Sequence, residues 1–253
     1  MIDIKTQCHT KILSHLPSHA RILDLGCGNG ELLKQIKDRK DGICYGVDLQ
    51  FSNVISCMKD GISIFQGNIN DGLKEFGDNS FDVVILSQTL QEVMDPVFVL
   101  NEMTRVGKTG IVTFPNFGYW RVRLNMALTG HSPKTKNLPY EWYNTPNLHM
   151  CSIQDFVNFC KKKNIPVICF PRGLDKNYKE FNNVVKPDAI SLDYDIDPTW
   201  VKKNLTNVVL QGGLDPKLLL SSEEEILDGA KKHLDIFKGL PYIFNLGHGL
   251  LPE

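Results

Sequence analysis

The sequence is poor in the features that mark membrane, secreted and nucleic-acid-binding proteins. It contains no apolar run long enough to span a bilayer, and its first residues lack the charged-then-apolar order of a signal peptide. It has no long basic run, and its formal net charge is −1. These absences favour a globular, cytoplasmic protein with no membrane or nucleic-acid partner, although a local basic patch would be compatible with them.

Paired cysteines of the C-x-x-C type are also missing. The cysteines are scattered and odd in number, at Cys8, Cys27, Cys44, Cys57, Cys151, Cys160 and Cys169. This spacing predicts reduced thiols, as in a cytosolic compartment, and disfavours a structural zinc site.

Short apolar runs alternate with helical patterns over the first two thirds of the chain. Strands are predicted at 22–25, 43–47, 62–65, 81–86 and 110–114, and helices near 31–37, 53–59 and 96–106. In the last helix, Val97, Leu100, Met103 and Val106 fall on one stripe. Such alternation predicts a parallel sheet with helices on both faces.

The composition changes after Phe114. Two segments rich in aromatic residues and proline, 114–121 and 138–149, are predicted to form ordered loops or caps. Ser152 is then the expected N-cap of a helix that runs to about Lys163.

A second βα series follows. Its strands are predicted at 167–170, 189–192, 208–211 and 242–245. Its clearest helix, 223–238, begins with a capping box of Ser222 and Glu225. The expected buried stripe of this helix is Ile226, Leu227, Ala230, Leu234 and Phe237.

The most informative segment is Arg21-Ile-Leu-Asp-Leu-Gly-Cys-Gly-Asn-Gly-Glu-Leu-Leu33. An apolar run containing an acid leads into a G-x-G-x-G turn, which differs from the G-x-G-x-x-G of a dinucleotide fold. Such a turn exposes backbone amides at a helix N-terminus to a ligand. Asp48 follows Gly28 by 20 residues, at the end of the next apolar run, where a carboxylate typically holds a ribose.

This arrangement resembles the S-adenosylmethionine (SAM) site of class I methyltransferases. The expected SAM-binding residues are Asp24, Gly26, Gly28, Gly30, Asp48, Asn68, Ser87 and Gln88. Plainer alternatives stand beside them: a turn that merely needs small residues, a solvated strand end at Asp48, and a turn asparagine at Asn68. Ser87 and Gln88 end the fourth predicted strand, at the sheet edge where α/β proteins bind ligands.

Longer sequence motifs over about 10–162 resemble those of the methionine biosynthesis protein MetW family. They include Asn79-Ser-Phe-Asp-Val-Val84, Phe114-Pro-Asn-Phe-Gly118 and Trp142-Tyr-Asn-Thr-Pro-Asn147. Tyr119 stands where that family often has a histidine. The resemblance implies a SAM-type Rossmann fold linked to methionine synthesis, with homoserine O-acyltransferase as the usual partner.

The sequence motifs from about residue 165 onward resemble the C-terminal part of uroporphyrinogen decarboxylase. They include Leu210-Gln-Gly-Gly-Leu-Asp-Pro216 and Ile243-Phe-Asn-Leu-Gly-His-Gly249. That family is a TIM barrel, and its histidine matching His248 lies in the porphyrinogen pocket. About four βα units are found here where a closed barrel has eight, and the family would continue with a further helix after Glu253.

We therefore expect an α/β protein with two parts. Residues 1–163 are predicted to form a MetW-like SAM-binding domain with a truncated, Rossmann-like parallel sheet. Residues 164–253 are predicted to form a decarboxylase-like fragment of βα units from a partial TIM barrel. A genuine fusion, a truncated pseudogene product and an assembly artefact each account for such a join.

Several other residues are candidates with two interpretations each. Candidates for a methyl-acceptor pocket, or for a packed aromatic cap, are Tyr119, Trp120, Trp142, Tyr143 and His149. Arg172 is a candidate carboxylate ligand, and His248 a candidate substrate-pocket residue. The series Asp193-x-Asp195-x-Asp197 lacks the glycine and the distal glutamate of a calcium loop, so a solvated turn is expected there.

The leading functional hypothesis is a SAM-binding, methyltransferase-like protein of methionine biosynthesis, acting as a methyltransferase or as a regulatory partner of homoserine O-acyltransferase. The alternative is a protein related to uroporphyrinogen decarboxylase, in porphyrin synthesis, that is inactive because half of the barrel is absent. A non-functional fusion is the third hypothesis. No catalytic residue and no metal site is assigned.

Overall fold

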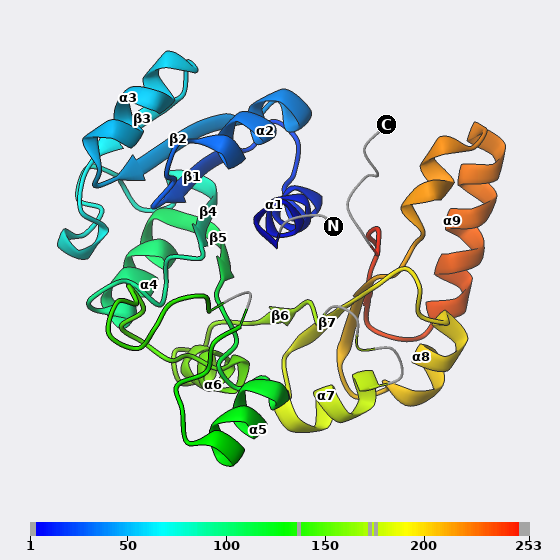
Figure 1. Cartoon of the computed structure of the whole chain (residues 1–253). Helices are drawn as coiled ribbons and strands as arrows, with labels where there is room; N and C mark the ends of the chain where they lie inside the picture. Colours follow the sequence, from blue (N-terminus) through cyan, green and yellow to red (C-terminus); the bar gives the residue numbers. More distant parts are fainter. Residues whose placement is uncertain (1–3, 136–137, 172–173, 175–176, 248–253) are drawn as a thin grey trace. The chain divides into compact units, whose positions relative to one another are not determined.

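The chain forms two compact units, Met1–Ser152 and Ile153–Glu253. The computed structural model describes residues 4–135, 138–171, 174 and 177–247 (Figure 1). The helix that follows Ser152 belongs by its contacts to the second unit. The join predicted near residue 163 concerns the origin of the two segments, and it stays a prediction.

The first unit is built on a five-stranded, fully parallel sheet with the order β3-β2-β1-β4-β5. Its strands are β1 (Arg21–Leu25), β2 (Ile43–Asp48), β3 (Ser63–Gln66), β4 (Phe81–Ser87) and β5 (Gly107–Thr113). Because the strand order reverses between β1 and β4, this pair forms the switch point of the sheet, where open α/β folds bind ligands beyond the carboxyl ends. The predicted Rossmann-like sheet is confirmed.

Helices cover this sheet. They are α1 (Ile4–His15), α2 (Glu31–Lys40), α3 (Phe51–Lys59), α4 (Pro96–Val106) and α5 (Trp120–Thr129), with a short 3-10 helix η1 (Ile69–Asp71). One core cluster joins Leu13 of α1, Ile36 of α2 and Cys57 of α3 to Ile22 of β1. The helices α1, α2 and α3 therefore bury their apolar sides against the same part of the sheet.

Helix α4 begins as the sequence predicts but turns a different residue inward. Asp95 caps it by accepting the Phe98 amide, and Pro96 occupies its first turn. Val99 is buried together with Leu100, whereas Val97 is 44% exposed. The expectation that Val97 lies on the buried stripe is wrong, because the face packed on β4 and β5 is rotated toward Val99.

The second unit contains a four-stranded parallel sheet in the simple order β6-β7-β8-β9. Its strands are β6 (Ile168–Cys169), β7 (Ala189–Leu192), β8 (Val209–Gly212) and β9 (Tyr242–Ile243). Its helices are α6 (Ile153–Lys162), α7 (Tyr178–Val185), α8 (Pro198–Asn204) and α9 (Glu223–Phe237), with a 3-10 helix η3 (Pro216–Leu220). Consecutive βα units in one parallel sheet are those of a partial TIM barrel, as predicted.

Helix α9 carries the predicted capping box and a different buried face. The Ser222 side chain accepts the Glu225 amide, and the Glu225 carboxylate accepts the Ser222 amide. The buried residues are His233 and Phe237, whereas Leu227 and Leu234 are exposed. The prediction for those two leucines is wrong, because the sheet lies against the neighbouring face of the helix.

The helices α1, α5, α7 and α8 are additions to the predicted elements. Helix α5 begins at Trp120, inside the segment 114–121 that was predicted to be a loop. Among the described residues, no helix combines the length and the apolar composition that crossing a membrane requires.

Candidate functional site

The glycine turn connects β1 to α2 with three residues in the left-handed region. Gly26, Gly28 and Gly30 have φ angles of 72°, 55° and 77°. The amides of Gly26 and Cys27 both donate to the Val47 carbonyl, at 2.8 and 3.1 Å, which ties the turn to the end of β2. Glycine adopts this backbone without the strain that a side chain would introduce.

The three glycines differ in what surrounds them. A Cβ added at Gly26 would stand 3.0 Å from the Thr89 side chain, and one added at Gly30 would stand 2.7 Å from the Cys57 sulfur. A Cβ added at Gly28 would meet nothing within 4 Å. Gly26 and Gly30 are therefore required by packing, and Gly28 is the position where the turn borders open space.

Asp48 ends β2 with its carboxylate turned toward this turn. The Gly28 amide donates to Oδ2 at 2.8 Å. The Gln50 amide and the Asn53 side-chain amide both donate to Oδ1 at 2.9 Å. Three donors hold the carboxylate in one orientation, and the structure thus brings the predicted acid and the predicted turn together.

Asp24 lies one strand away in a very different state. It is 3% exposed and accepts no hydrogen bond from any residue in the described part of the chain. Burial, and then the charge of Asp48, raise its pKa to about 7. A buried carboxyl without a protein partner is costly when ionised, and a cation beside it would offset that cost.

Two cysteines pack behind the turn. The Cys57 and Cys27 thiols donate to the Gly28 carbonyl at 3.5 and 3.8 Å. Burial is the main cause that raises the pKa of each thiol, so both stay protonated at neutral pH. They orient the Gly28 peptide as weak donors and are poor candidates for a nucleophile.

The other predicted ligand residues stand at the carboxyl ends of β3 and β4, engaged with neighbouring side chains. Asn68 accepts the Asn70 backbone and side-chain amides at 3.0 and 2.9 Å and caps η1. The Ser87 hydroxyl lies 3.1 Å from the hydroxyl of Thr113, and the Gln88 side-chain amide donates to that same hydroxyl at 3.2 Å. Gln88 has a φ of 56°, an uncommon conformation for this residue type.

Sequence reasoning missed Asn53 and Thr113. Asn53 belongs to α3, and its spacing from Asp48 carries no recognisable motif. Thr113 ends β5, so its position at the carboxyl edge of a predicted strand could have indicated it.

The predicted aromatic residues are largely exposed. Trp142 is 75% exposed and Tyr143 is 70% exposed, and their rings meet edge to face at 5.7 Å. Tyr119 and Trp120 are also exposed, and the His149 amide donates to the Gln91 carbonyl at 3.1 Å. The interpretation as a packed cap is therefore wrong for the four exposed tyrosine and tryptophan side chains. His149 is half-buried with a buried Nε2, and the acceptor pocket stays a prediction.

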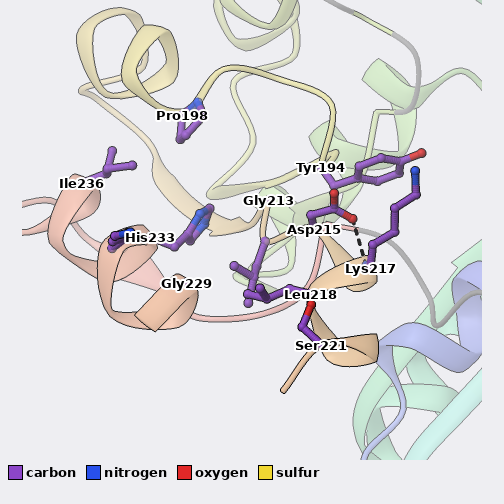
Figure 2. Close-up of a pocket in the computed structure, with 12 residues that line it drawn as sticks. Tyr194, Pro198, Gly213, Asp215, Lys217, Leu218, Ser221, Gly229, His233 and Ile236 are labelled. Carbon is purple, nitrogen blue, oxygen red and sulfur yellow. Dashed lines mark hydrogen bonds between the residues drawn. The ribbon is translucent and has the colours of Figure 1, made fainter. Parts of the chain in front are cut away.

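The second unit contains a cavity of about 500 Å³ between η3 and α9 (Figure 2). Tyr194, Lys217 and His233 contribute to its lining. His233 Nε2 lies 2.9 Å from the Tyr242 hydroxyl, which donates to the Gly212 carbonyl at 2.6 Å. His233 is thus a satisfied, buried histidine of the helix–sheet packing.

The remaining candidates of this half do not form a site in the described residues. Arg172 and His248 lie outside those residues. Asp197 caps α8 by accepting the Thr199 amide at 2.9 Å, as a turn residue does. Within the described ranges no group of three or more His, Cys, Asp or Glu side chains is arranged to hold a metal.

The parallel sheet with its glycine turn and its acid at the end of β2 has the arrangement that the sequence predicts for a class I methyltransferase-like protein. The family model of the methionine biosynthesis protein MetW matches residues 6–183, and that of uroporphyrinogen decarboxylase (URO-D) matches residues 147–253. The chain belongs to the MetW family, and its C-terminal part is similar to uroporphyrinogen decarboxylase.

Curated relatives agree with both assignments. The bifunctional methionine biosynthesis protein MetXA/MetW of Rhodopirellula baltica is 38% identical over 165 residues, which are 62% of this chain and 26% of that protein. The uroporphyrinogen decarboxylase of a Wolbachia from Drosophila simulans is 46% identical over 88 residues, which are 35% of this chain and 26% of that enzyme. The chain thus spans about a quarter of the length of these relatives.

Solved structures similar to the chain include a SAM-dependent methyltransferase of Thermotoga maritima, described as a possible histamine N-methyltransferase. It is 21% identical, covers 62% of this chain and 68% of that one, and has a TM-score of 0.47. A putative methyltransferase in complex with the Trm112 activator of Haloferax volcanii is 26% identical, covers 40% of this chain and 48% of that one, and has a TM-score of 0.36.

Proposed function

We propose that the first unit binds SAM beyond the carboxyl ends of β1 and β2, with the ribose on Asp48 and the amino-acid part of the ligand along Gly28. One observation carries the proposal. The turn position that borders open space donates its amide to the same carboxylate that would accept the ribose hydroxyls. The left-handed φ of Gly28 favours glycine at this position by itself, and the open space beside its amide is where the proposed ligand would lie.

The charges of the site support a cationic ligand. SAM carries an ammonium and a sulfonium group, and its sulfonium supplies an electrophilic methyl group when the molecule is bound. Asp24 and Asp48 are both buried, and Asp24 has no partner in the described residues. The two cationic groups of SAM, which also carries one carboxylate and is a monocation overall, would offset the desolvation of these two carboxylates better than a neutral ligand would.

The proposal stops at binding and positioning. Methyl transfer to a strong nucleophile depends mainly on the placement of the two reactants, so a general base is not a requirement. Tyr119, Trp142, Tyr143 and His149 stay candidates for holding an acceptor. Catalytic and regulatory roles of the bound SAM are both compatible with this site.

We further propose that the protein associates with a homoserine O-acyltransferase. The support is the fusion named MetXA/MetW in Rhodopirellula baltica, which places a relative of this chain in one polypeptide with a second methionine-biosynthesis module. Fusion keeps two modules at a high local concentration. Separate proteins reach the same proximity only by binding to each other.

The experiment is isothermal titration of the full chain with SAM and with S-adenosylhomocysteine (SAH). Gly28→Ala should weaken both affinities at least tenfold, because the new methyl group enters the space next to the ribose carboxylate. Gly130→Ala is the matched control, since Gly130 also has a left-handed φ, 67°, and open space around it. Absence of binding by the wild type, or equal binding by both variants, would contradict the proposal.

A further inference from the structure

Helix α5 presents an apolar stripe to the solvent. Trp120, Leu124 and Leu128 are spaced by four residues, and they are 57%, 48% and 76% exposed. Residues with this spacing lie on one side of a helix. Val122, the one buried residue of α5, lies on the opposite side.

The helix itself is well formed. Gly130 ends it in a left-handed conformation, with its amide donated to the Met126 carbonyl at 2.9 Å. A ten-residue helix is marginal when isolated, and this one is held to the body through a single buried side chain. An outward stripe of three large apolar residues on the surface of the first unit is typical of an interaction site.

The stripe is bordered by positive charge. Arg121 and Arg123 flank it on its two sides, and neither forms an ion pair within the described residues. Arg121 lies over the Trp120 ring at 5.2 Å. No acidic residue stands in the sequence between Glu102 and Glu141, so neither α5 nor the segments that flank it supply a carboxylate to this border.

We propose that α5 is a docking helix whose stripe of Trp120, Leu124 and Leu128 enters an apolar groove rimmed by carboxylates on a protein partner. This inference rests on the proposed association, and the occupant to which it commits is the homoserine O-acyltransferase. Helices bind protein grooves through anchors spaced by three or four residues, and arginine and aromatic residues are enriched at such contacts.

The charge pattern argues against two other occupants. A symmetric pair of α5 helices would gather two arginines from each copy around one contact, and neither helix contains a carboxylate to pair with them. A helix that lies on a membrane typically has a wide apolar face and a polar face rich in lysine or arginine, whereas α5 has a narrow stripe between two arginines.

The test measures binding of the full chain to the purified homoserine O-acyltransferase of the same genome, by biolayer interferometry. Leu124→Glu and Leu128→Glu should each weaken binding at least tenfold, and Arg123→Glu should weaken it and reduce its salt dependence. Met58→Glu is the control, because Met58 is a 66% exposed apolar residue of another helix, α3, and it should change affinity less than twofold. SAH titration of every variant confirms that the first unit is folded.

Each outcome decides the inference. Loss of binding in the two leucine variants with retention in Met58→Glu supports it. Equal loss in all three, or no loss in any, overturns it, as does absence of acyltransferase binding by a wild type that still binds SAH. Binding to anionic vesicles, or a dimer in sedimentation velocity, that Leu124→Glu abolishes would also overturn it, in favour of a membrane or a second copy.

Discussion

The carboxylate of Asp48 accepts the backbone amide of Gly28 at 2.8 Å, across a sequence separation of 20 residues. This bond joins the end of β2 to the turn after β1, so a ligand on either side of it would contact both. The glycine turn and Asp48, the two strongest signals in the sequence, are therefore directly connected in the structure. Several predictions depend on how rigidly this connection is held.

Asn53→Leu should weaken SAH binding about tenfold. The substitution keeps the side-chain volume but removes the amide that donates to Asp48 at 2.9 Å, and hydrogen bonds to a carboxylate are worth about 1.5–3 kcal/mol. Isothermal titration measures the loss. Asn101→Leu, at an exposed position of α4, should leave the affinity unchanged.

A second ligand shows whether Asn53→Leu weakens binding through the orientation of the Asp48 carboxylate or through a general disturbance of the site. An SAH analogue with a 2′,3′-dideoxyribose lacks the hydroxyl groups that Asp48 would accept. The wild type and Asn53→Leu should therefore bind this analogue with equal, weak affinity. An equal loss for SAH and for the analogue would show that Asn53 does not act through the ribose carboxylate.

SAM affinity should rise with pH through neutrality. The pKa of Asp24 is raised to about 7, chiefly by burial, so the carboxyl is mostly protonated at pH 6 and mostly ionised at pH 8. If the ionised form faces the cationic ligand, binding should tighten by roughly tenfold across this range. Titrations with Asp24→Asn should show weak binding and a flat profile, and an unchanged slope in that variant would contradict the role of Asp24.

The same residue should reduce stability at alkaline pH. Because the pKa of Asp24 is higher in the folded chain than its ordinary value of 3.8, the folded state binds the proton more tightly, and stability falls as pH rises from about 4 to 7. Asp24→Asn cannot ionise, so at pH 8 it should be more stable than the wild type by roughly 2–4 kcal/mol in urea unfolding. If Asp24→Asn were less stable than the wild type at pH 8, the ionised Asp24 carboxylate would not destabilise the folded chain, contrary to this prediction.

The capping box of α9 should stabilise the second unit. Ser222→Ala removes the side-chain oxygen that accepts the Glu225 amide, which should lower the free energy of unfolding by about 1 kcal/mol. Ser221→Ala changes a neighbouring serine whose described contacts are those of its backbone, and it should be nearly neutral. Urea unfolding followed by helical circular dichroism compares the two, and equal effects would argue against the cap.

The local chemistry of the first sheet was readable from sequence, and its pairwise contacts were not. The glycine turn, Asp48 and the parallel strands each leave a pattern, because glycine conformation and strand burial are local demands. The Asn53 contact depends on where α3 lies relative to β2, which no spacing records. Helix faces fail in the same way: Leu227 and His233 both fit an amphipathic α9, and only the packed sheet selects His233.

The segment after β5 illustrates a second limit. Prolines and aromatic residues in 114–121 indicate loops, yet α5 begins at Trp120. Its outward apolar stripe contradicts the usual pattern of burial, so a method that assigns apolar residues to a core cannot place it. Such local inconsistencies are expected where a surface serves binding.

The chain should not decarboxylate uroporphyrinogen. The described second unit has four parallel strands, and a closed TIM barrel has eight, so the residues in hand form only part of a substrate cavity. Porphyrin fluorescence after incubation with uroporphyrinogen and oxidation should reveal the eight-carboxylate compound alone. Appearance of products with fewer carboxylates would contradict this prediction.

The most direct test of the account is a crystal structure of the full chain grown with SAH. The proposed site predicts the two ribose hydroxyls within hydrogen-bond distance of the Asp48 carboxylate and the amino-acid part of SAH against Gly28. Electron density for SAH elsewhere, with Asp48 bound only to its present partners, would contradict it.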